Sequence, residues 1–367
     1  MKRQVLAAVA AIGALSLSAC GSGVTANGGD GDTYTLTGVT AAPAGSPSEA
    51  ITEWFVEEVE KRSDGRLVVD MAATGTQCDA AEVVVCVQDG RADLGVSVPD
   101  YTPQLFPDAA VVGLPFLGLD HGAVTEALAK THEEHEGAQQ LYEDHGLTYI
   151  SEWPVGRLLF GTKQALESAD GLEGQKMRLS NPLIMRAGEI AGANNVSLTA
   201  AETYESIERG VADGVGFSLD GAVSFNLAEL LPYWSDPGTG HYSSFAMWIN
   251  SDTYQGLPED LQAVVEEVKT ELNTGQGAEL ADIKTAEQCD QLNESSNLES
   301  LEVWDAGATE AWKDELGTEL EERWLQEAEE YGLNDPQGYL ETYKKNLEAA
   351  GNNPEDDPTV QCLNRSN

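Results

Sequence analysis

Basic residues are scarce in this chain of 367 residues, in which 63 aspartates and glutamates outnumber 20 lysines and arginines and the formal net charge is −43. Such a charge repels the phosphates of nucleic acids and of anionic lipid headgroups. The acids recur along predicted helices, as at Glu319, Glu321 and Glu322, which is typical of a solvated surface. Nucleic-acid binding is therefore excluded as a function.

The usual motifs of catalysis are also missing. The sequence has no G-x-S-x-G elbow, no G-x-x-x-x-G-K-[ST] phosphate loop and no G-x-G-x-x-G after a predicted strand. His132 and His135 are three positions apart, not four as in the zinc motif H-E-x-x-H, so we interpret them as part of a solvated face of an acidic helix. We therefore expect that the protein is not an enzyme and that it binds no metal and no cofactor.

Long apolar runs are limited to one, from Val5 to Leu17, which is too short to span a bilayer. Two basic residues precede it, as in an export signal. The run ends in Leu17-Ser-Ala-Cys20, the order that places the lipid-accepting thiol in bacterial lipoproteins. We predict a signal peptide over 1–19, a lipid anchor on Cys20 and a glycine-rich flexible tether over 20–32. A general export signal that happens to contain Cys20 is the alternative.

Four cysteines remain after Cys20, and they are Cys78, Cys86, Cys289 and Cys362. An even number in an exported protein favours two disulfides. Three pairings are possible, and locality favours Cys78–Cys86 with Cys289–Cys362. Their loop lengths predict stabilisation by roughly 2.5 and 4.5 kcal/mol. A zinc site is disfavoured because there is no C-x-x-C pair and the histidines lie far away in sequence.

Apolar segments alternate with helical patterns through the rest of the chain, which predicts an α/β fold. The predicted strands are 35–40, 66–72, 92–98, 147–153, 175–179 and 195–198. The predicted helices are 46–64, 79–88, 121–144, 182–191, one beginning at the capping box of 199–202, 258–292, 308–331 and 336–349. Ligands bind such sheets beyond the carboxyl ends of the strands.

Two arginines fall at strand boundaries beside this predicted crevice, Arg157 and Arg178. A guanidinium can bind a carboxylate through two parallel hydrogen bonds. In so acidic a chain, either arginine can equally pair with a carboxylate of the protein itself. The residues alone leave both interpretations open.

Several segments follow one another in a characteristic order: SDGRLVVDM from Ser63, VQDGRADLG from Val87, LPFLGLDHGAV from Leu114, DGLEGQKMRLSNP from Asp170 and HYSSFAMWIN from His241. In order and spacing they resemble the solute-binding proteins of TRAP (tripartite ATP-independent periplasmic) transporters, the DctP family. The resemblance extends over most of the chain that follows the predicted tether.

The resemblance implies an α/β, two-lobed fold like that of periplasmic binding proteins, the Venus flytrap, with mixed sheets and a long lobe-connecting helix. Lobe I would comprise 33–152 and 243–285, and lobe II 153–242 and 286–350, followed by an irregular tail over 351–367. The implied function is that of a monomeric extracytoplasmic receptor that delivers a small organic acid to a small and a large membrane subunit. A binding protein of an ATP-driven importer or of a sensor system is the alternative.

The resemblance also assigns roles to single residues. Arg178 occupies the arginine position of the G-x-K-x-R segment, which forks the ligand carboxylate in the family. Arg157 matches a second, supporting arginine, and Asn181 matches a polar residue three positions after the first.

Three further residues are candidates for the cleft. Phe217 stands where a ligand-facing Asn is common in the family, which points to an apolar or aromatic carboxylate, although Phe217 can equally belong to the core. Trp153 can form an aromatic wall or pack within a lobe. Glu82 matches a recurrent acidic position, yet stabilisation by a helix dipole explains it equally well.

Overall fold

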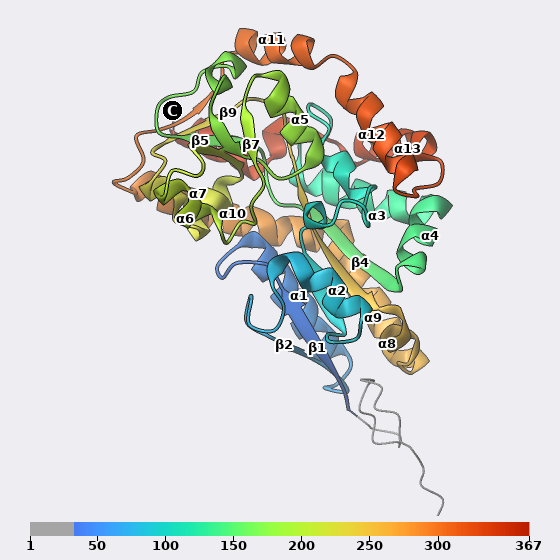
Figure 1. Ribbon diagram of the computed structural model, residues 1–367. Helices are drawn as coiled ribbons and strands as arrows, with labels where there is room; N and C mark the ends of the chain where they lie inside the picture. Colours follow the sequence, from blue (N-terminus) through green and yellow to red (C-terminus); the bar gives the residue numbers. More distant parts are fainter. Residues whose placement is uncertain (1–32, 367) are drawn as a thin grey trace, which may run out of the picture.

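The computed structural model describes residues 33–366, and the predicted signal peptide, Cys20 and the tether lie outside them. The first sheet contains β1 (Tyr34–Thr40), β2 (Leu67–Met71), β3 (Leu94–Ser97), β4 (Leu147–Pro154) and β10 (Ser244–Asn250). The second sheet contains β5 (Leu159–Thr162), β6 (Lys176–Arg178), β7 (Asn194–Val196), β8 (Gly214–Phe217), β9 (Tyr233–Asp236) and β11 (Ser300–Val303). Figure 1 shows a lobe built around each sheet.

Both sheets mix parallel and antiparallel neighbours, which confirms the predicted two-lobed α/β class. The strand order is β2-β1-β3-β10-β4 in the first sheet and β11-β9-β5-β8-β6-β7 in the second. In the first sheet β10 runs antiparallel to β3 and β4, whereas β1 is parallel to β2 and β3. In the second sheet β5 runs antiparallel to β8 and β9.

Helices surround the two sheets. They are α1 (Pro47–Arg62), α2 (Val83–Gln88), α3 (His121–Glu134), α4 (Glu136–Asp144), α5 (Pro182–Ile190), α6 (Thr203–Glu208), α7 (Leu219–Ser224), α8 (Ser251–Gln255), α9 (Glu259–Glu271), α10 (Gly277–Glu294), α11 (Ala306–Leu316), α12 (Glu319–Glu330), α13 (Pro336–Ala350) and α14 (Pro358–Ser366). None of these helices combines the length and the apolar content needed to cross a bilayer.

The first helix shows how local sequence sets an element. The Ser46 side chain accepts a hydrogen bond from the backbone N–H of Glu49, and a proline opens the first turn, as expected of a helix start. Ile51, Phe55 and Val59 follow at helical spacing and are buried in the core of the first lobe. The predicted start of this helix is therefore confirmed.

The chain passes between the lobes in three places. One crossing segment, 155–158, joins β4 to β5, and another, 237–243, joins β9 to β10. The third connection is α10, which packs on α1 of the first lobe and on α7 of the second. These three connections hold the two lobes next to each other.

The predicted continuous helix over 258–292 is wrong in its middle. Residues 272–276 separate α9 from α10, and Gly275 there has a φ of 139°, which favours glycine. Asn273 binds β4 at this point, because its Nδ2 donates to the carbonyl of Ile150 at 2.9 Å and its Oδ1 accepts from Ser151 Oγ at 2.7 Å. The break lets α9 cover the first sheet while α10 continues to the second lobe.

Two other long helices are also divided. The predicted helix over 121–144 is interrupted at His135, whose Nδ1 accepts from the N–H of Ala138 and so caps α4. The predicted helix over 308–331 is interrupted at Gly317, which has a φ of 51°. His132 stacks on Tyr149 with ring centroids 4.1 Å apart, and burial lowers the pKa of His132 to about 3. The interpretation of His132 and His135 as a solvated face is therefore wrong.

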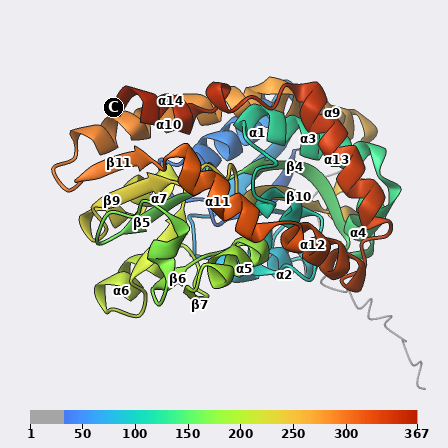
Figure 2. The ribbon, with the colours of Figure 1, turned by 90° about the horizontal axis from the view of Figure 1, so that it is seen from above.

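The C-terminal helices join the two lobes. Leu340 of α13, expected in lobe II, lies in one hydrophobic core with Leu128 of α3 and with Phe160 of β5. Trp324 of α12 donates through Nε1 to the carbonyl of Pro107 at 2.9 Å. Figure 2 shows these helices arching over both lobes.

The predicted irregular tail over 351–367 is wrong, because residues 358–366 form α14. Cys362 of α14 is bonded to Cys289 of α10, and Cys78 is bonded to Cys86. Both predicted disulfides are therefore confirmed. The Cys289–Cys362 bond fastens the C-terminal helix to the helix that connects the lobes, and Figure 2 shows these two helices, α14 and α10, side by side.

Candidate functional site

A small cavity of about 30 Å³ lies between the lobes. The first lobe and the crossing segment contribute Ala41, Val98, Tyr101, Tyr242, Ser243 and Phe245. The second lobe contributes Arg178, Ala200, Phe217, Ser218, Asp220 and Phe225. A single water requires about 10–15 Å³ of such space. The lobes are therefore closed, and an organic acid can enter only if they move apart.

Arg178 is the cationic side chain of this cavity. It ends β6, beside Val215 of β8, and is 2 % exposed. Its Nε donates to the carbonyl of Leu198 at 3.1 Å. Within residues 33–366 no carboxylate forms an ion pair with Arg178. A buried guanidinium without an ion-pair partner is unfavourable, so both terminal nitrogens are suited to bind a ligand anion.

Aromatic rings form the adjoining wall. The Phe217 ring centroid lies 4.9 Å from Arg178 Cζ and 5.4 Å from the ring of Phe225. Phe245 stacks on Trp153 at 6.3 Å, and Trp153 Nε1 donates to Ser48 Oγ at 3.1 Å. Trp153 therefore supports the wall from behind, whereas Phe217 lines the cavity itself.

Asp100 lies next to the cavity and close to Arg178. Burial raises the pKa of Asp100 to about 7, while hydrogen bonds from Ser243 and Asn181 and the charge of Arg178 oppose this rise. Ser243 Oγ donates to Oδ2 at 2.5 Å, and Asn181 Nδ2 donates to Oδ1 at 3.1 Å. Both oxygens of Asp100 are thus engaged by the protein.

Asp220 is a second buried acid, and it lines the cavity directly. Its Oδ1 accepts from Ser224 Oγ at 2.5 Å and from Gln288 Nε2 at 2.7 Å. Burial raises the pKa of Asp220, and these two hydrogen bonds lower it in part. Gln288 belongs to α10, so the lobe-connecting helix holds this carboxyl group in place.

Arg157 lies in a crossing segment, away from the cavity wall. Its Nε is 2.5 Å from Asp236 Oδ2, and both side chains are buried. Burial raises the pKa of Asp236, and the charge of Arg157 opposes this. An isolated β-bridge between Arg157 and His241 joins the two crossing segments to each other, and the ion pair ties Arg157 to the end of β9.

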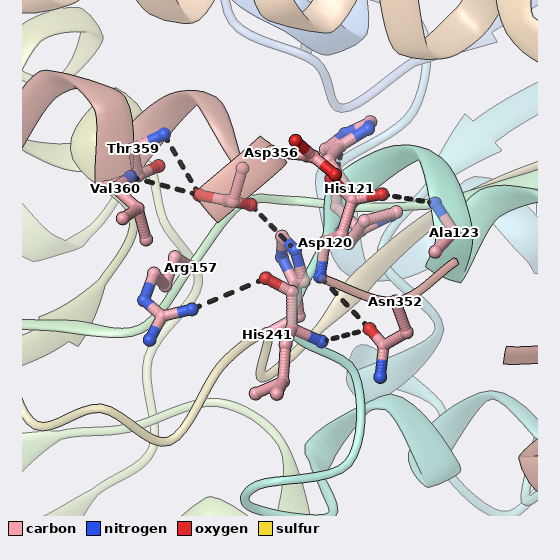
Figure 3. Close-up of polar contacts among 12 residues, drawn as sticks. Asp120, His121, Ala123, Arg157, His241, Asn352, Asp356, Thr359 and Val360 are labelled. Carbon is pink, nitrogen blue, oxygen red and sulfur yellow. Dashed lines mark hydrogen bonds and ion pairs between the residues drawn. The ribbon is translucent and has the colours of Figure 1, made fainter. Parts of the chain in front are cut away.

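The end of the chain is held against these crossing segments, as Figure 3 shows. Asp357 Oδ2 lies 3.1 Å from His241 Nε2, and Asp357 Oδ1 accepts from the N–H of Thr359 at 2.9 Å. Burial acts to raise the pKa of Asp357, but His241 outweighs it, so this pKa lies below its usual value. The side chain of Asn352 accepts from the N–H of Leu119 at 2.7 Å.

Asn181 and Glu82 do not line the cavity. The Oδ1 of Asn181 caps α5 by accepting from the N–H of Leu183 at 2.9 Å, so Asn181 reaches the cavity only through its bond to Asp100. Glu82 is exposed on a short 3₁₀ turn before α2. Of the six predicted ligand-binding residues, the structure brings Arg178 and Phe217 together and leaves Arg157, Asn181, Trp153 and Glu82 behind or outside the wall.

Sequence reasoning missed several residues of the cavity: Tyr101, Asp220, Phe225, Tyr242 and Phe245. A signal for two of them was present, because Tyr101 follows the carboxyl end of β3 and Asp220 follows that of β8.

Across residues 33–366, no three His, Cys, Asp or Glu side chains gather in a group able to hold a metal ion.

The protein has two lobes joined by three crossings, and the closed cavity between them contains a buried arginine. This arrangement is typical of ligand-binding proteins that open and close around a small molecule. Residues 38–327 match the model of the DctP family, bacterial extracellular solute-binding protein family 7. The chain therefore belongs to this family and is a solute-binding protein of the TRAP type.

Similar proteins agree with this assignment. The ectoine-binding periplasmic protein TeaA of Halomonas elongata is 26 % identical over 316 residues, which cover 83 % of this chain and 87 % of TeaA. A TRAP solute-binding protein of Rhodoferax ferrireducens, solved with copurified benzoate, superposes with a TM-score of 0.78 at 20 % identity, covering 87 % of this chain and 98 % of that one. A protein of Bordetella bronchiseptica with bound mandelate gives 0.75 at 23 % identity, covering 86 % and 99 %.

Proposed function

We propose that this protein is the extracytoplasmic receptor of a TRAP-type transporter, which captures a small organic acid and delivers it to a small and a large membrane subunit. The observation that carries the proposal is Arg178, a buried guanidinium at the cavity that has no ion-pair partner among the described residues. The molecules bound by the similar proteins are ectoine, benzoate and mandelate, and each of them contains a carboxylate.

The ligand carboxylate receives two hydrogen bonds from the terminal nitrogens of Arg178 in this proposal. Phe217, Phe225 and Phe245 offer ring faces to the body of the ligand, which suits an apolar or aromatic acid. The ligand bridges the two lobes and so shifts the population to the closed form, which the membrane subunits recognise. No chemical step is required, and the protein acts as a receptor and not as an enzyme.

A thermal-unfolding screen over organic acids tests this proposal. A true ligand at 100 times its dissociation constant should stabilise the folded protein by about 2.7 kcal/mol. The ligand should be recovered chemically unchanged after incubation. Failure of every carboxylate to raise the unfolding temperature, or conversion of the ligand to a product, would contradict the proposal.

The genes beside that of this protein separate the TRAP receptor from a receptor of an ATP-driven importer or sensor. We expect one small and one large integral membrane subunit there. An adjacent ATPase or sensor kinase would favour the alternative.

The proposed lipid anchor leads to a test that leaves the binding domain intact. Cys20→Ser should move the protein from the membrane fraction to the soluble extracytoplasmic fraction, because it removes the thiol that carries the lipid. Fractionation and immunoblotting measure this, and calorimetry should show unchanged ligand affinity. A Cys20→Ser protein that stays with the membrane would contradict the lipoprotein assignment.

The net charge of −43 predicts an unusual salt dependence for an anionic ligand. An approaching anion crosses a repulsive field, which salt weakens, and the Debye length is roughly 8 Å at 0.15 M. The association rate should therefore rise between low and physiological salt, whereas dissociation should change less because closed-lobe contacts exclude solvent. Stopped-flow fluorescence measures both rates, with Trp153 behind Phe245 as a reporter. An association rate that falls steadily with salt would refute the argument.

A further inference from the structure

Asp220 is an acid that an organic-anion site does not need. It is 9 % exposed and lines the same cavity as Arg178. Only Oδ1 is hydrogen-bonded, to Ser224 and Gln288, and Oδ2 accepts no hydrogen bond from any residue between 33 and 366. A buried carboxylate with one free oxygen and no ion-pair partner in the described part of the chain is unfavourable unless a ligand completes its environment.

Asp220 and Arg178 are separate from each other within the cavity. They form no ion pair, yet both act on Tyr242, whose pKa burial raises, Arg178 lowers and Asp220 raises. Tyr242 therefore lies within the field of both charges. Asp100 also raises the pKa of Tyr242, but it differs from Asp220 because both of its oxygens are occupied by hydrogen bonds. The cavity thus has a positive pole at Arg178 and a distinct negative pole at Asp220.

The position of Asp220 is rigid. It follows β8 directly, on α7, and a Cβ at the neighbouring Gly221 would lie 2.2 Å from Phe217 Cδ1, so α7 packs closely on that ring. Gln288 of the lobe-connecting helix holds Oδ1. The rings of Phe217 and Phe225 line the same cavity and lie 5.4 Å apart, and the Phe217 ring already contacts the Arg178 guanidinium.

We propose that this site selects zwitterionic acids, whose carboxylate binds Arg178 and whose cationic group, an ammonium or amidinium, binds Asp220. This inference rests on the proposed function, since it refines the ligand of the same cavity. A zwitterion neutralises both poles at once, whereas a simple aromatic or aliphatic monoanion leaves Asp220 buried without a counter-charge.

Calorimetry with paired probes tests the selection. Ectoine and pipecolate carry both charges, and benzoate and cyclohexanecarboxylate are rings of similar size with the carboxylate alone. The wild-type protein should bind its preferred zwitterion at least about tenfold more tightly than either monoanion. Asp220→Asn should remove this preference, weakening zwitterion binding by about tenfold or more relative to monoanion binding.

Asp100→Asn is the matched control, because it also removes a buried acid at the cavity. Asp100 lies near Arg178, so its replacement should change the binding of both ligand classes in the same direction and by a similar factor. Asp220→Glu, which keeps the charge, should retain the preference for zwitterions. Circular dichroism should show that each variant is folded, and the wild-type comparison needs no variant at all.

Three results would overturn the inference: monoanions that bind the wild-type protein as tightly as zwitterions, an Asp220→Asn variant that loses both classes equally, or one that keeps full zwitterion affinity. The last result would mean that Asp220 serves only as a hydrogen-bonding group. If no acid of either class binds, the proposed function itself fails. If monoanions bind through Arg178 and zwitterions do not, the proposed function stands and only the inference on zwitterions fails.

Discussion

Arg178→Ala is expected to weaken ligand binding by about 2–5 kcal/mol, because it leaves the ligand carboxylate desolvated and without its two hydrogen bonds in the closed cavity. Arg178 is 2 % exposed, and Leu198 and Phe217 fix its side chain in position. No other lysine or arginine lines this cavity in the described part of the chain. Isothermal titration calorimetry with the best acid from the screen measures the loss.

Arg178→Lys should restore little of this affinity, since an ammonium is a point charge and cannot form the parallel pair of bonds. Arg186→Ala serves as the matched control. Arg186 also belongs to the second lobe, but it is bound to Glu189 and Glu319 on the surface. Binding by the Arg186 variant should equal that of the wild type. An Arg178→Ala protein whose affinity stays within twofold of wild type would refute the carboxylate contact.

Loss of the Cys289–Cys362 disulfide should lower the free energy of unfolding by roughly 4.5 kcal/mol, since the bond closes a long loop and restricts the unfolded chain. The two cysteines are 73 positions apart. The double variant Cys289→Ser, Cys362→Ser should also loosen α14 from α10, and with it the contact between Asp357 and His241. Urea unfolding followed by tryptophan fluorescence measures the change.

The other disulfide provides the control for this prediction. Cys78 and Cys86 are only 8 positions apart, so the double serine variant should lose roughly 2.5 kcal/mol. The two results should therefore rank by loop length. If the Cys78 and Cys86 variant were the less stable of the two, restriction of the unfolded chain would not be the main effect of these bonds.

Local signals in the sequence predicted the elements well where a start or a pairing is encoded nearby. Ser46 and Pro47 mark the start of α1, and Asp335 with Pro336 marks that of α13. The long helices were extended too far, because a helical spacing of apolar residues continues past Gly275 and Gly317. At the first of these points a tertiary contact, Asn273 with β4, accompanies the break in the helix, and no local pattern reports it.

The two arginines show the same difference between what local sequence predicts and what a tertiary contact decides. Arg157 and Arg178 look alike in sequence, as cations at strand boundaries of an acidic chain. Asp236, which is 79 positions from Arg157, neutralises that arginine in the folded protein. Arg178, in contrast, donates to the Leu198 carbonyl and lies beside the Phe217 ring, and no carboxylate among residues 33–366 forms an ion pair with it. Resemblance to the family had already distinguished Arg178 as the principal arginine, but the removal of Arg157 from the cavity wall depended on a distant partner.

The amino-acid sequence by itself indicated the α/β class and favoured the observed pairing of the four cysteines, because these depend on periodicity and on separation along the chain. Its short motifs indicated the family, and resemblance to the family singled out Arg178. Only the tertiary structure decided that Asp220 lines the cavity of Arg178, that Trp153 lies behind Phe245, and that the end of the chain forms a helix bonded to α10. The physical reason is that burial and charge pairing are set by residues far apart in the chain. Asp220 follows β8 in sequence, but its burial and its hydrogen bond from Gln288, 68 positions away, arise only in the folded chain.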